Sequence, residues 1–238
     1  MKLVPSLPRA AGAVEMLDRP AAFAELRQGL ADVARLNGLF GGRLLTVSHV
    51  KRLLARTAGA RPLTVLDVGT GGADIPRALA RWARRTGRAI RIVALDRDGP
   101  TLEVARRHLA GYPEVTLLRG DALALPVRPG SVDVAISALT LHHLEPDGAA
   151  RHLAELDRAA RCGLVVNDLA RSRTAYGLVW LATRLLSRSA MSRHDGPMSV
   201  RRAYAPAELR AICDAAGLGD VRIVRYRPLL RQCAVRSK

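Results

Sequence analysis

Three aspartates follow short apolar runs at regular intervals along the chain. Asp67 comes just before a glycine turn that contains Gly69 and Gly71, where glycine lets the backbone approach a ligand closely and take positive φ. A carboxylate here is badly suited to a pyrophosphate and well suited to a cationic or amine-bearing ligand. Asp96, 25 positions after Gly71, can accept hydrogen bonds from both hydroxyls of a ribose. Asp121 can accept one from the exocyclic amine of an adenine.

These elements together resemble the class I S-adenosyl-L-methionine-dependent methyltransferase family. Residues 63–74 are similar to the family's hydrophobic-hydrophobic-Asp-x-Gly-x-Gly-x-Gly motif, with Ala73 in place of the last glycine. Asp96 matches the family's ribose-binding acid and Asp121 its adenine-side acid. Residues 131–137 look like its fourth strand.

The resemblance covers residues 63–168 and implies S-adenosyl-L-methionine as the cofactor. In the family, the first two glycines of the motif contact the methionine part of the cofactor. Each aspartate also has a structural interpretation: a turn carboxylate at Asp67, a helix N-cap at Asp96 and an Asx turn at Asp121. Because three ordered elements coincide on successive strands, we expect the cofactor to be bound by Asp67, Gly69, Thr70, Gly71, Asp96, Arg97, Asp121, Ala122 and Ser137.

Polar side chains also follow the fourth and fifth apolar runs, where an acceptor would lie. His142 and His143 form a pair that could orient a phenol or take its proton, and this Leu-His-His-Leu stretch is frequent in the small-molecule branch of the family. We expect one histidine to face the methyl group and the other to pack or cap the next helix; the alternative is that neither does chemistry. Asn167 and Asp168 either bond the acceptor hydroxyl or form a strand-end turn.

His194, in the polar stretch 192–197, is the third acid/base candidate. This stretch is expected either to fold over the site or to be a solvated loop. A metal cluster of His142, His143 and His194 is an alternative that the spacing does not establish, and no metal is expected.

Strands and helices alternate through most of the chain, which predicts a parallel sheet with right-handed crossovers. The expected fold is α/β: a seven-stranded, mostly parallel, Rossmann-like methyltransferase sheet with an antiparallel last hairpin, N-terminal helices and a helical cap insertion. The expected strands are 63–68, 90–95, 115–119, 132–137, 164–166, 221–227 and 231–235. The expected helices of this domain are 75–84, 100–109, 147–160 and 206–216.

The flanking segments are expected to cover the site. Residues 1–60 would form a loose arm (1–18) and two or three helices, and residues 61–238 the methyltransferase domain. The cap insertion, 172–200, would hold one helix, 174–186, and an irregular stretch, 187–199. The acceptor pocket would be lined by Phe23, Phe40, Trp180, Leu181 and Leu185, for which simple core packing is the alternative.

The composition of the chain limits which kinds of partner it is expected to bind. The formal charge is +17, but only three of the 38 basic residues are lysines and the arginines are spread over the whole length. Aromatic residues make up 3%, whereas a protein that stacks nucleic-acid bases on its side chains is expected to contain more of them. A nucleic-acid partner is therefore not expected, and the segment 137–140 lacks the Asn/Asp-Pro-Pro-aromatic pattern of adenine-N6 enzymes.

The favoured function is O-methylation of a phenolic or polyketide-type metabolite in secondary metabolism. The alternatives are an RNA- or protein-directed methyltransferase and a non-catalytic binding module, the latter disfavoured by the intact glycine turn and three acids. Three distant cysteines give no disulfide framework and no paired metal ligands. We expect a cytoplasmic monomer or homodimer with no membrane span and no signal peptide.

Overall fold

The sheet has seven strands in the order β3-β2-β1-β4-β5-β7-β6. The structure is a computed structural model that describes residues 7–55, 61–227 and 230–238. Strands β1 to β5 are parallel, and β7 runs antiparallel to both β5 and β6. This topology confirms the expected fold. The strands are β1 (Leu63–Val68), β2 (Ile90–Asp96), β3 (Val115–Arg119), β4 (Val132–Ala138), β5 (Ala160–Leu169), β6 (Arg222–Tyr226) and β7 (Arg231–Ser237).

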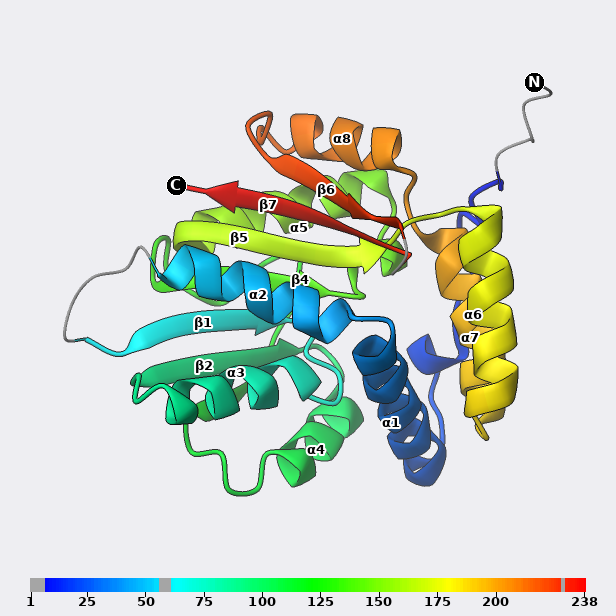
Figure 1. Cartoon of the computed structure of the whole chain (residues 1–238), viewed down its shortest axis with the longest axis horizontal. Helices are drawn as coiled ribbons and strands as arrows, with labels where there is room; N and C mark the ends of the chain where they lie inside the picture. The colour runs from blue at the N-terminus through cyan, green and yellow to red at the C-terminus, as the bar shows by residue number, and fades with distance from the viewer. Residues whose placement is uncertain (1–6, 56–60, 228–229) are drawn as a thin grey trace.

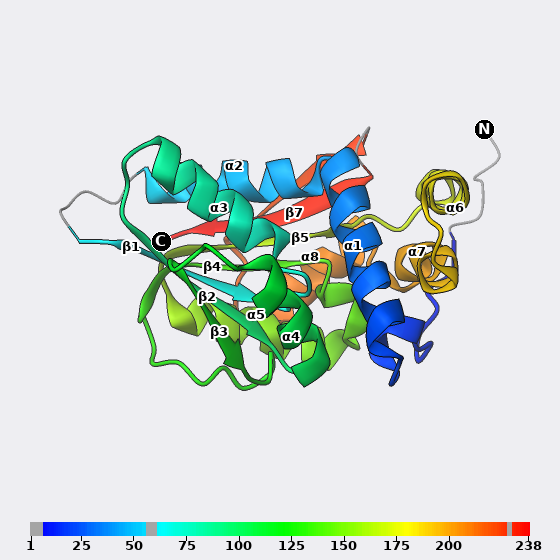
Figure 2. The same cartoon turned by 90° about the horizontal axis from the view of Figure 1, so that it is seen from below.

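Helices cover both faces of this sheet (Figure 2). Helices α2 (Gly42–Leu54) and α3 (Asp74–Arg85) bury their apolar sides on one face, together with side chains of β1, β2 and β4. Helices α5 (Pro146–Ala159) and α8 (Pro206–Ala215) pack on the other face. Helix α4 (Gly99–His108) packs near the β2–β3 edge. With both faces covered, the strands read as nearly continuous apolar runs.

Three helices lie beyond the end of the sheet toward which the parallel strands point (Figure 1). They are α1 (Phe23–Leu39), α6 (Arg173–Leu186) and α7 (Ala190–Arg202). Helix α7 packs against α6 and against α1. Ligands of open α/β sheets bind at this carboxyl end of the strands, so these helices cover the place where a site is expected. The division at residue 60 and the status of 172–200 as an insertion stay predictions.

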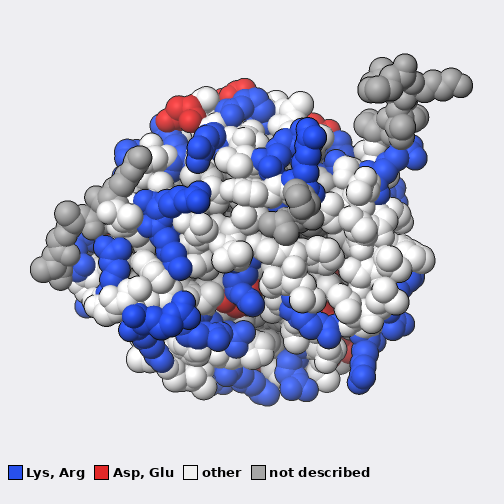
Figure 3. All heavy atoms as spheres, viewed as in Figure 1, with Lys and Arg blue, Asp and Glu red and all other residues white. Residues whose placement is uncertain are grey.

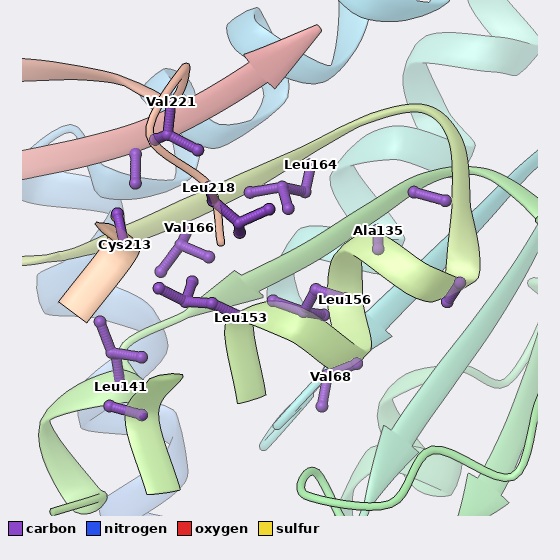
Figure 4. Close-up of a cluster of buried hydrophobic side chains, with 14 of the residues drawn as sticks. Val68, Ala135, Leu141, Leu153, Leu156, Leu164, Val166, Cys213, Leu218 and Val221 are labelled. Carbon is purple, nitrogen blue, oxygen red and sulfur yellow. The ribbon is translucent and has the colours of Figure 1, made fainter. Parts of the chain in front are cut away.

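A short 3-10 helix, η2 (Leu141–His143), follows β4 and carries both candidate histidines. Leu141 is 1% exposed and points into the apolar cluster formed with α5, α8 and the sheet (Figure 4). Burying a leucine side chain contributes about 1.5–3 kcal/mol to the stability of the folded state. The core therefore anchors the segment that presents the histidine pair.

Two expectations for the covering segments are wrong. Residues 187–199 were expected to be irregular, but α7 runs through them with Pro197 inside the helix. Packing of Met191 and Val200 in the interior outweighs the local breaking signal. Residues 7–18 are also no loose arm, because Glu15 is 2% exposed and Met16–Asp18 forms the 3-10 helix η1. Residues 1–6 of that expected arm lie outside the described residues.

Strand β5 is longer than the expected 164–166. Its last residues pair with β7, with Asn167 opposite Cys233 and Asp168 opposite Gln232. This extension was not predicted because strands were recognised by runs of apolar residues, and Asn167 and Asp168 are polar. Both side chains are consequently buried at the sheet's carboxyl edge.

The buried carboxylate of Asp133 ties the amino ends of β1 and β4 together. It accepts hydrogen bonds from the Arg61 guanidinium at 2.5 and 3.0 Å, from the Thr64 backbone N–H at 2.8 Å and from Arg161 at 3.0 Å. Burial would raise the pKa of Asp133, but these bonds outweigh it and hold the pKa well below its usual value.

We expect Asp133→Asn to lower the free energy of unfolding at pH 7 by about 2–3 kcal/mol, because charge-assisted bonds are lost. A lowered folded-state pKa stabilises only above the unfolded value of about 3.9, and that contribution is lost as the pH falls below it. Urea unfolding at pH 7 and pH 3 should therefore show the difference between wild type and variant shrinking at pH 3. The matched control, Asp220→Asn in an exposed pair with Arg236, should change stability far less. A difference that grows toward low pH would contradict this account.

Candidate active site

The glycine turn after β1 takes the backbone conformation that its composition predicts. Gly69 and Gly71 have φ of +73° and +51°. Ala73, where the family motif has glycine, also has a positive φ of 57° and is the N-cap of α3. An alanine in the left-handed region costs about 1–2 kcal/mol, which the surrounding packing must offset. A Cβ built on Gly69 would lie 2.3 Å from the Thr140 hydroxyl oxygen, so the turn is pressed against the loop after β4.

Asp67 is a buried carboxyl at the end of β1. It is 2% exposed and accepts a hydrogen bond of 2.7 Å from the Thr70 hydroxyl. Burial is the main reason that its pKa rises to about 7, and the nearby Asp74 and Asp96 charges add to the effect. A buried carboxylate that costs this much to ionise is stabilised by a cationic partner.

Asp96 and Asp121 follow the next two strands. Asp96 accepts hydrogen bonds from the backbone N–H of Gly71 at 3.0 Å and of Asp98 at 3.2 Å, and burial raises its pKa. The exposed Asp121 accepts one from the Leu123 N–H at 2.8 Å, which is the Asx turn considered above. Both carboxylates lie at the same edge of the sheet as Asp67, a set that fits an amine-bearing nucleoside better than a phosphate.

The other expected cofactor residues lie around these acids. Ser137 is fully buried, and its Oγ lies 3.0 Å from His152 Nε2. The other ring nitrogen of His152 lies 3.1 Å from the Ala122 carbonyl oxygen. His152, which lies on α5, therefore links the segment after β3 to the end of β4. Arg97 is exposed and lies 3.9 Å from Asp18 of η1.

His142 and His143 lie side by side at the sheet edge, with ring centroids 4.3 Å apart. His142 is 2% exposed, and its Nδ1 lies 2.7 Å from Asp168 Oδ1, while its backbone N–H donates to Asp168 Oδ2 at 3.0 Å. Burial alone would raise the pKa of Asp168, but the charge and hydrogen bonds of His142 hold it below its usual value. Asp168 is thus an ionised acceptor, and His142 Nδ1 carries the hydrogen. In the neutral form of the ring, this bond leaves the lone pair on His142 Nε2.

His143 has the same arrangement with a different partner. Its Nδ1 lies 2.9 Å from Asp18 Oδ2. Burial would raise the pKa of Asp18, yet His143, Arg202 and Arg97 lower it, so Asp18 is the ionised acceptor. The Nε2 atom of His143 is also left with a lone pair.

Glu15 faces both histidines from the N-terminal segment. Its Oε1 lies 3.6 Å from His142 Nε2, and its Oε2 lies 3.8 Å from His143 Nε2. Oε2 accepts a hydrogen bond of 3.0 Å from Ser199, whereas the buried Oε1 has no hydrogen-bond partner among the described residues. Burial raises the pKa of Glu15 to about 7.

These polar groups lie at one end of a cavity between α1, α6 and the sheet edge. It contains about 690 Å³ of space between atoms, part of it open to solvent. The Arg231 side chain, 4% exposed, also lines it, and its Nε and one Nη have no hydrogen-bond partner among the described residues. The rest of the wall is largely apolar and includes Val33, Leu36, Phe40, Leu139, Leu169 and Val179.

Several expected site residues lie elsewhere. His194 is not brought to His142 and His143: it lines a separate cavity with Trp180, and its Nδ1 lies 2.7 Å from Asp195. Of the expected lining residues only Phe40 borders the main cavity. Phe23 packs against the cluster of Leu26, Leu30 and Val104, and Leu181 and Leu185 are 47% and 73% exposed.

The sequence interpretation missed Glu15, Asp18 and Arg231. Glu15 and Asp18 stand in a proline-bearing stretch without apolar periodicity, so no pattern marked them. Arg231 was one of many arginines. A buried charge can be recognised only once the fold shows what surrounds it.

The family model described as "Methyltransferase domain" matches residues 65–163. Among curated proteins, a demethylmenaquinone methyltransferase of Roseiflexus castenholzii is 32% identical over 168 residues, covering 66% of this chain and 68% of that protein. A 2-phytyl-1,4-naphtoquinone methyltransferase of Thermosynechococcus vestitus is 44% identical over 66 residues, 28% of each chain. The first curated relatives are thus matched over about a third of their length or less.

Solved structures share the fold at low identity. A SAM-dependent methyltransferase from Aquifex aeolicus aligns with a TM-score of 0.54 and 21% identity, over 78% of this chain and 85% of that one. The CMeT domain of a citrinin polyketide synthase aligns with a TM-score of 0.59 and 13% identity, over 78% and 49%.

The contact between Gly69 and Thr140 gives a test of this geometry. We expect Gly69→Ala to lower the free energy of unfolding by about 1–3 kcal/mol more than Gly87→Ala, because both have positive φ but only Gly69 is crowded. Adding Thr140→Ala, which removes the two nearest atoms, should recover part of the loss. Urea unfolding of the wild type and the three variants checks this. Equal effects of the two glycine substitutions would show that the turn and the loop do not touch.

Proposed function

Because the chain belongs to the class I S-adenosyl-L-methionine-dependent methyltransferase family, we propose that it methylates an oxygen of a phenolic or polyketide-type small molecule. The observation that carries the proposal is the histidine pair, buried His142 and half-buried His143, in the wall of a largely apolar cavity. An aromatic acceptor with one hydroxyl toward the pair matches such walls. The quinone-type substrates in the names of two relatives have the same apolar ring character.

A small acceptor also agrees better with the surface than a nucleic acid does. On the face drawn in Figure 3, Lys and Arg side chains are scattered over most elements rather than gathered in one tract. None of the described helices is long and apolar enough to cross a membrane. The buried guanidinium of Arg231 has two nitrogens with no hydrogen-bond partner in the part of the chain that the structure describes, which favours an acceptor that brings a second oxygen or a carboxylate into the cavity.

The cofactor would be held by the three acids of the sheet edge. Asp67 would attract the ammonium of its methionine part, Asp96 would accept from the ribose hydroxyls and Asp121 from the adenine amine. The positive-φ glycines allow the close approach. When bound, S-adenosyl-L-methionine supplies a methyl carbon on a positively charged sulfur.

The residues of this chain then have to position and activate the acceptor oxygen. A phenol has a pKa of about 10 and is protonated at neutral pH. In the simplest mechanism, the lone pair on His142 Nε2, whose ring is fixed by Asp168, accepts that proton. The oxygen forms the new O–C bond while the C–S bond breaks and its electron pair stays on sulfur. The apolar wall excludes water, and most of the rate gain is positioning.

We expect His142→Ala or His143→Ala to lower turnover of a phenolic acceptor about 100-fold or more, while the affinity for S-adenosyl-L-methionine stays within a few-fold. His194→Ala should lose far less, because its ring lies outside the cavity. Mass spectrometry of the methylated product and calorimetry with the cofactor measure the two quantities. Methylation at the parent rate in both His142→Ala and His143→Ala would show that neither histidine activates the acceptor oxygen.

The raised pKa of Asp67 predicts a pH-dependent cofactor affinity. With a pKa of about 7, the carboxyl is increasingly neutral below pH 7 and loses its attraction for an ammonium group. We expect the Kd for S-adenosyl-L-methionine to rise as the pH falls from 8 to 6, by at most about tenfold per pH unit.

Asp67→Asn should bind weakly at pH 8 and show a much flatter profile, whereas the exposed control Asp147→Asn should follow the wild type. Calorimetry at three pH values checks this. If Asp67→Asn and wild type have the same pH profile, another group is responsible.

A further inference from the structure

Three ligand-type atoms face one another at the polar end of the cavity. One carboxylate oxygen of Glu15 and one nitrogen each of His142 and His143 lie within 4.8 Å of one another. The two closest carboxylate–imidazole separations are 3.6 and 3.8 Å. Two atoms that each lie about 2.1 Å from a tetrahedral ion are about 3.4 Å apart. The first of these separations joins His142 to Oε1 and the second joins His143 to Oε2, and both are close to the spacing of two ligands on one metal ion.

The second observation is how the two rings are held. Histidines that bind a metal commonly donate their other ring N–H to a carboxylate or carbonyl group. Here both do: His142 Nδ1 lies 2.7 Å from Asp168, and His143 Nδ1 lies 2.9 Å from Asp18. Each Nε2 is thereby left as a lone-pair donor directed to the same carboxylate, Glu15. Two adjacent histidines used only for packing or capping would not need this matched arrangement.

Glu15 supplies the third observation. Its Oε1 is buried and lacks a hydrogen-bond partner among the described residues, and an unpaired buried carboxylate oxygen is costly. The nearest cation to it, the Arg202 guanidinium, is 4.0 Å away and donates to the backbone carbonyls of His142 and His143 instead. Asp195 fixes the Glu15 segment by accepting the N–H groups of Met16 and Leu17. The oxygen is thus held toward the two imidazoles without a hydrogen-bond partner among the described residues.

We propose that Glu15, His142 and His143 bind a divalent cation of the zinc type, with its remaining coordination position open to the cavity. Two histidines and one glutamate are a known ligand set for catalytic zinc, which keeps an open position. The inference rests on the proposed function for its role, with the ion replacing the His142 lone pair as the group that activates the acceptor: the open position takes the acceptor hydroxyl and lowers its pKa. The hydroxyl proton goes to solvent, the oxygen then bonds to the methyl carbon, and the C–S electron pair stays on sulfur. No redox change occurs, which suits zinc.

The test is zinc binding by the whole chain. After removal of metal with a chelator, we expect wild type to bind one equivalent of Zn²⁺ by calorimetry. The Co²⁺-loaded protein should show the visible bands of a four-coordinate ion. Glu15→Gln should weaken Zn²⁺ binding at least 100-fold. Asp18→Asn, which removes the carboxylate that holds the His143 ring and pairs with Arg202, should weaken it about 10- to 100-fold. Glu25→Gln, at an exposed position of α1, is the matched control and should bind like wild type.

The outcomes separate this inference from the proposed function. If chelated wild type binds no Zn²⁺ and gives no Co²⁺ bands, the metal site is wrong; a phenol methylated by the metal-free protein would then show the histidines acting alone. If Glu15→Gln and Asp18→Asn bind Zn²⁺ like wild type, the bound ion is elsewhere and the assignment is also wrong. If the expected binding pattern appears but phenols are not methylated, the metal site is supported and the proposed phenolic acceptor is wrong.

Discussion

The buried hydrogen bond between His142 and Asp168 is the contact on which the acceptor side of the site depends. Asp168, 4% exposed at the end of β5, accepts from the His142 ring, the His142 backbone N–H and the Leu169 backbone N–H. A buried carboxylate is tolerable only when its oxygens are satisfied in this way. The same bonds fix the loop after β4 against β5 and decide which nitrogen of His142 faces the cavity. Sheet pairing, loop position and tautomer therefore follow from one interaction.

The N-terminal segment completes the site through polar contacts rather than apolar packing. Asp195 of α7 holds the backbone of Met16 and Leu17, and Arg202 of the same helix binds Asp18 and the carbonyls of the histidine pair. Asp18 also lies 3.9 Å from Arg97 after β2. One carboxylate thus links Arg97, which follows β2, to His143. The covering helices position the reactive side chains as well as closing the cavity.

The sheet could be predicted from sequence because its signal is local. Apolar runs, glycine turns and the acids at strand ends recur at short spacing, and the alternation of strands and helices predicted a mostly parallel sheet. The covering part could not be predicted in the same way. Helix α7 contains Gly196 and Pro197, which locally oppose a helix, and only packing on α6 and α1 overrides them. Glu15 lies more than 120 positions from the histidines it faces, and no periodicity relates the two.

This difference between the sheet and the covering segments explains why similarity to relatives indicates the type of reaction more clearly than it indicates the acceptor molecule. The family model matches residues 65–163, which hold the glycine turn, the three strand-end acids and the histidine pair. Glu15, Asp18, Asp168 and Arg231 all lie outside that range. These are the groups that orient the imidazoles, face them with a carboxylate and place a cation in the cavity wall. A shared sheet fixes where the methyl donor would lie, whereas the chemistry applied to the acceptor depends on charges from segments that differ between members of a fold family. Apart from Leu139, His142 and His143, the cavity wall is accordingly built from residues 15–40 and from residues after 163, outside the range of the family model.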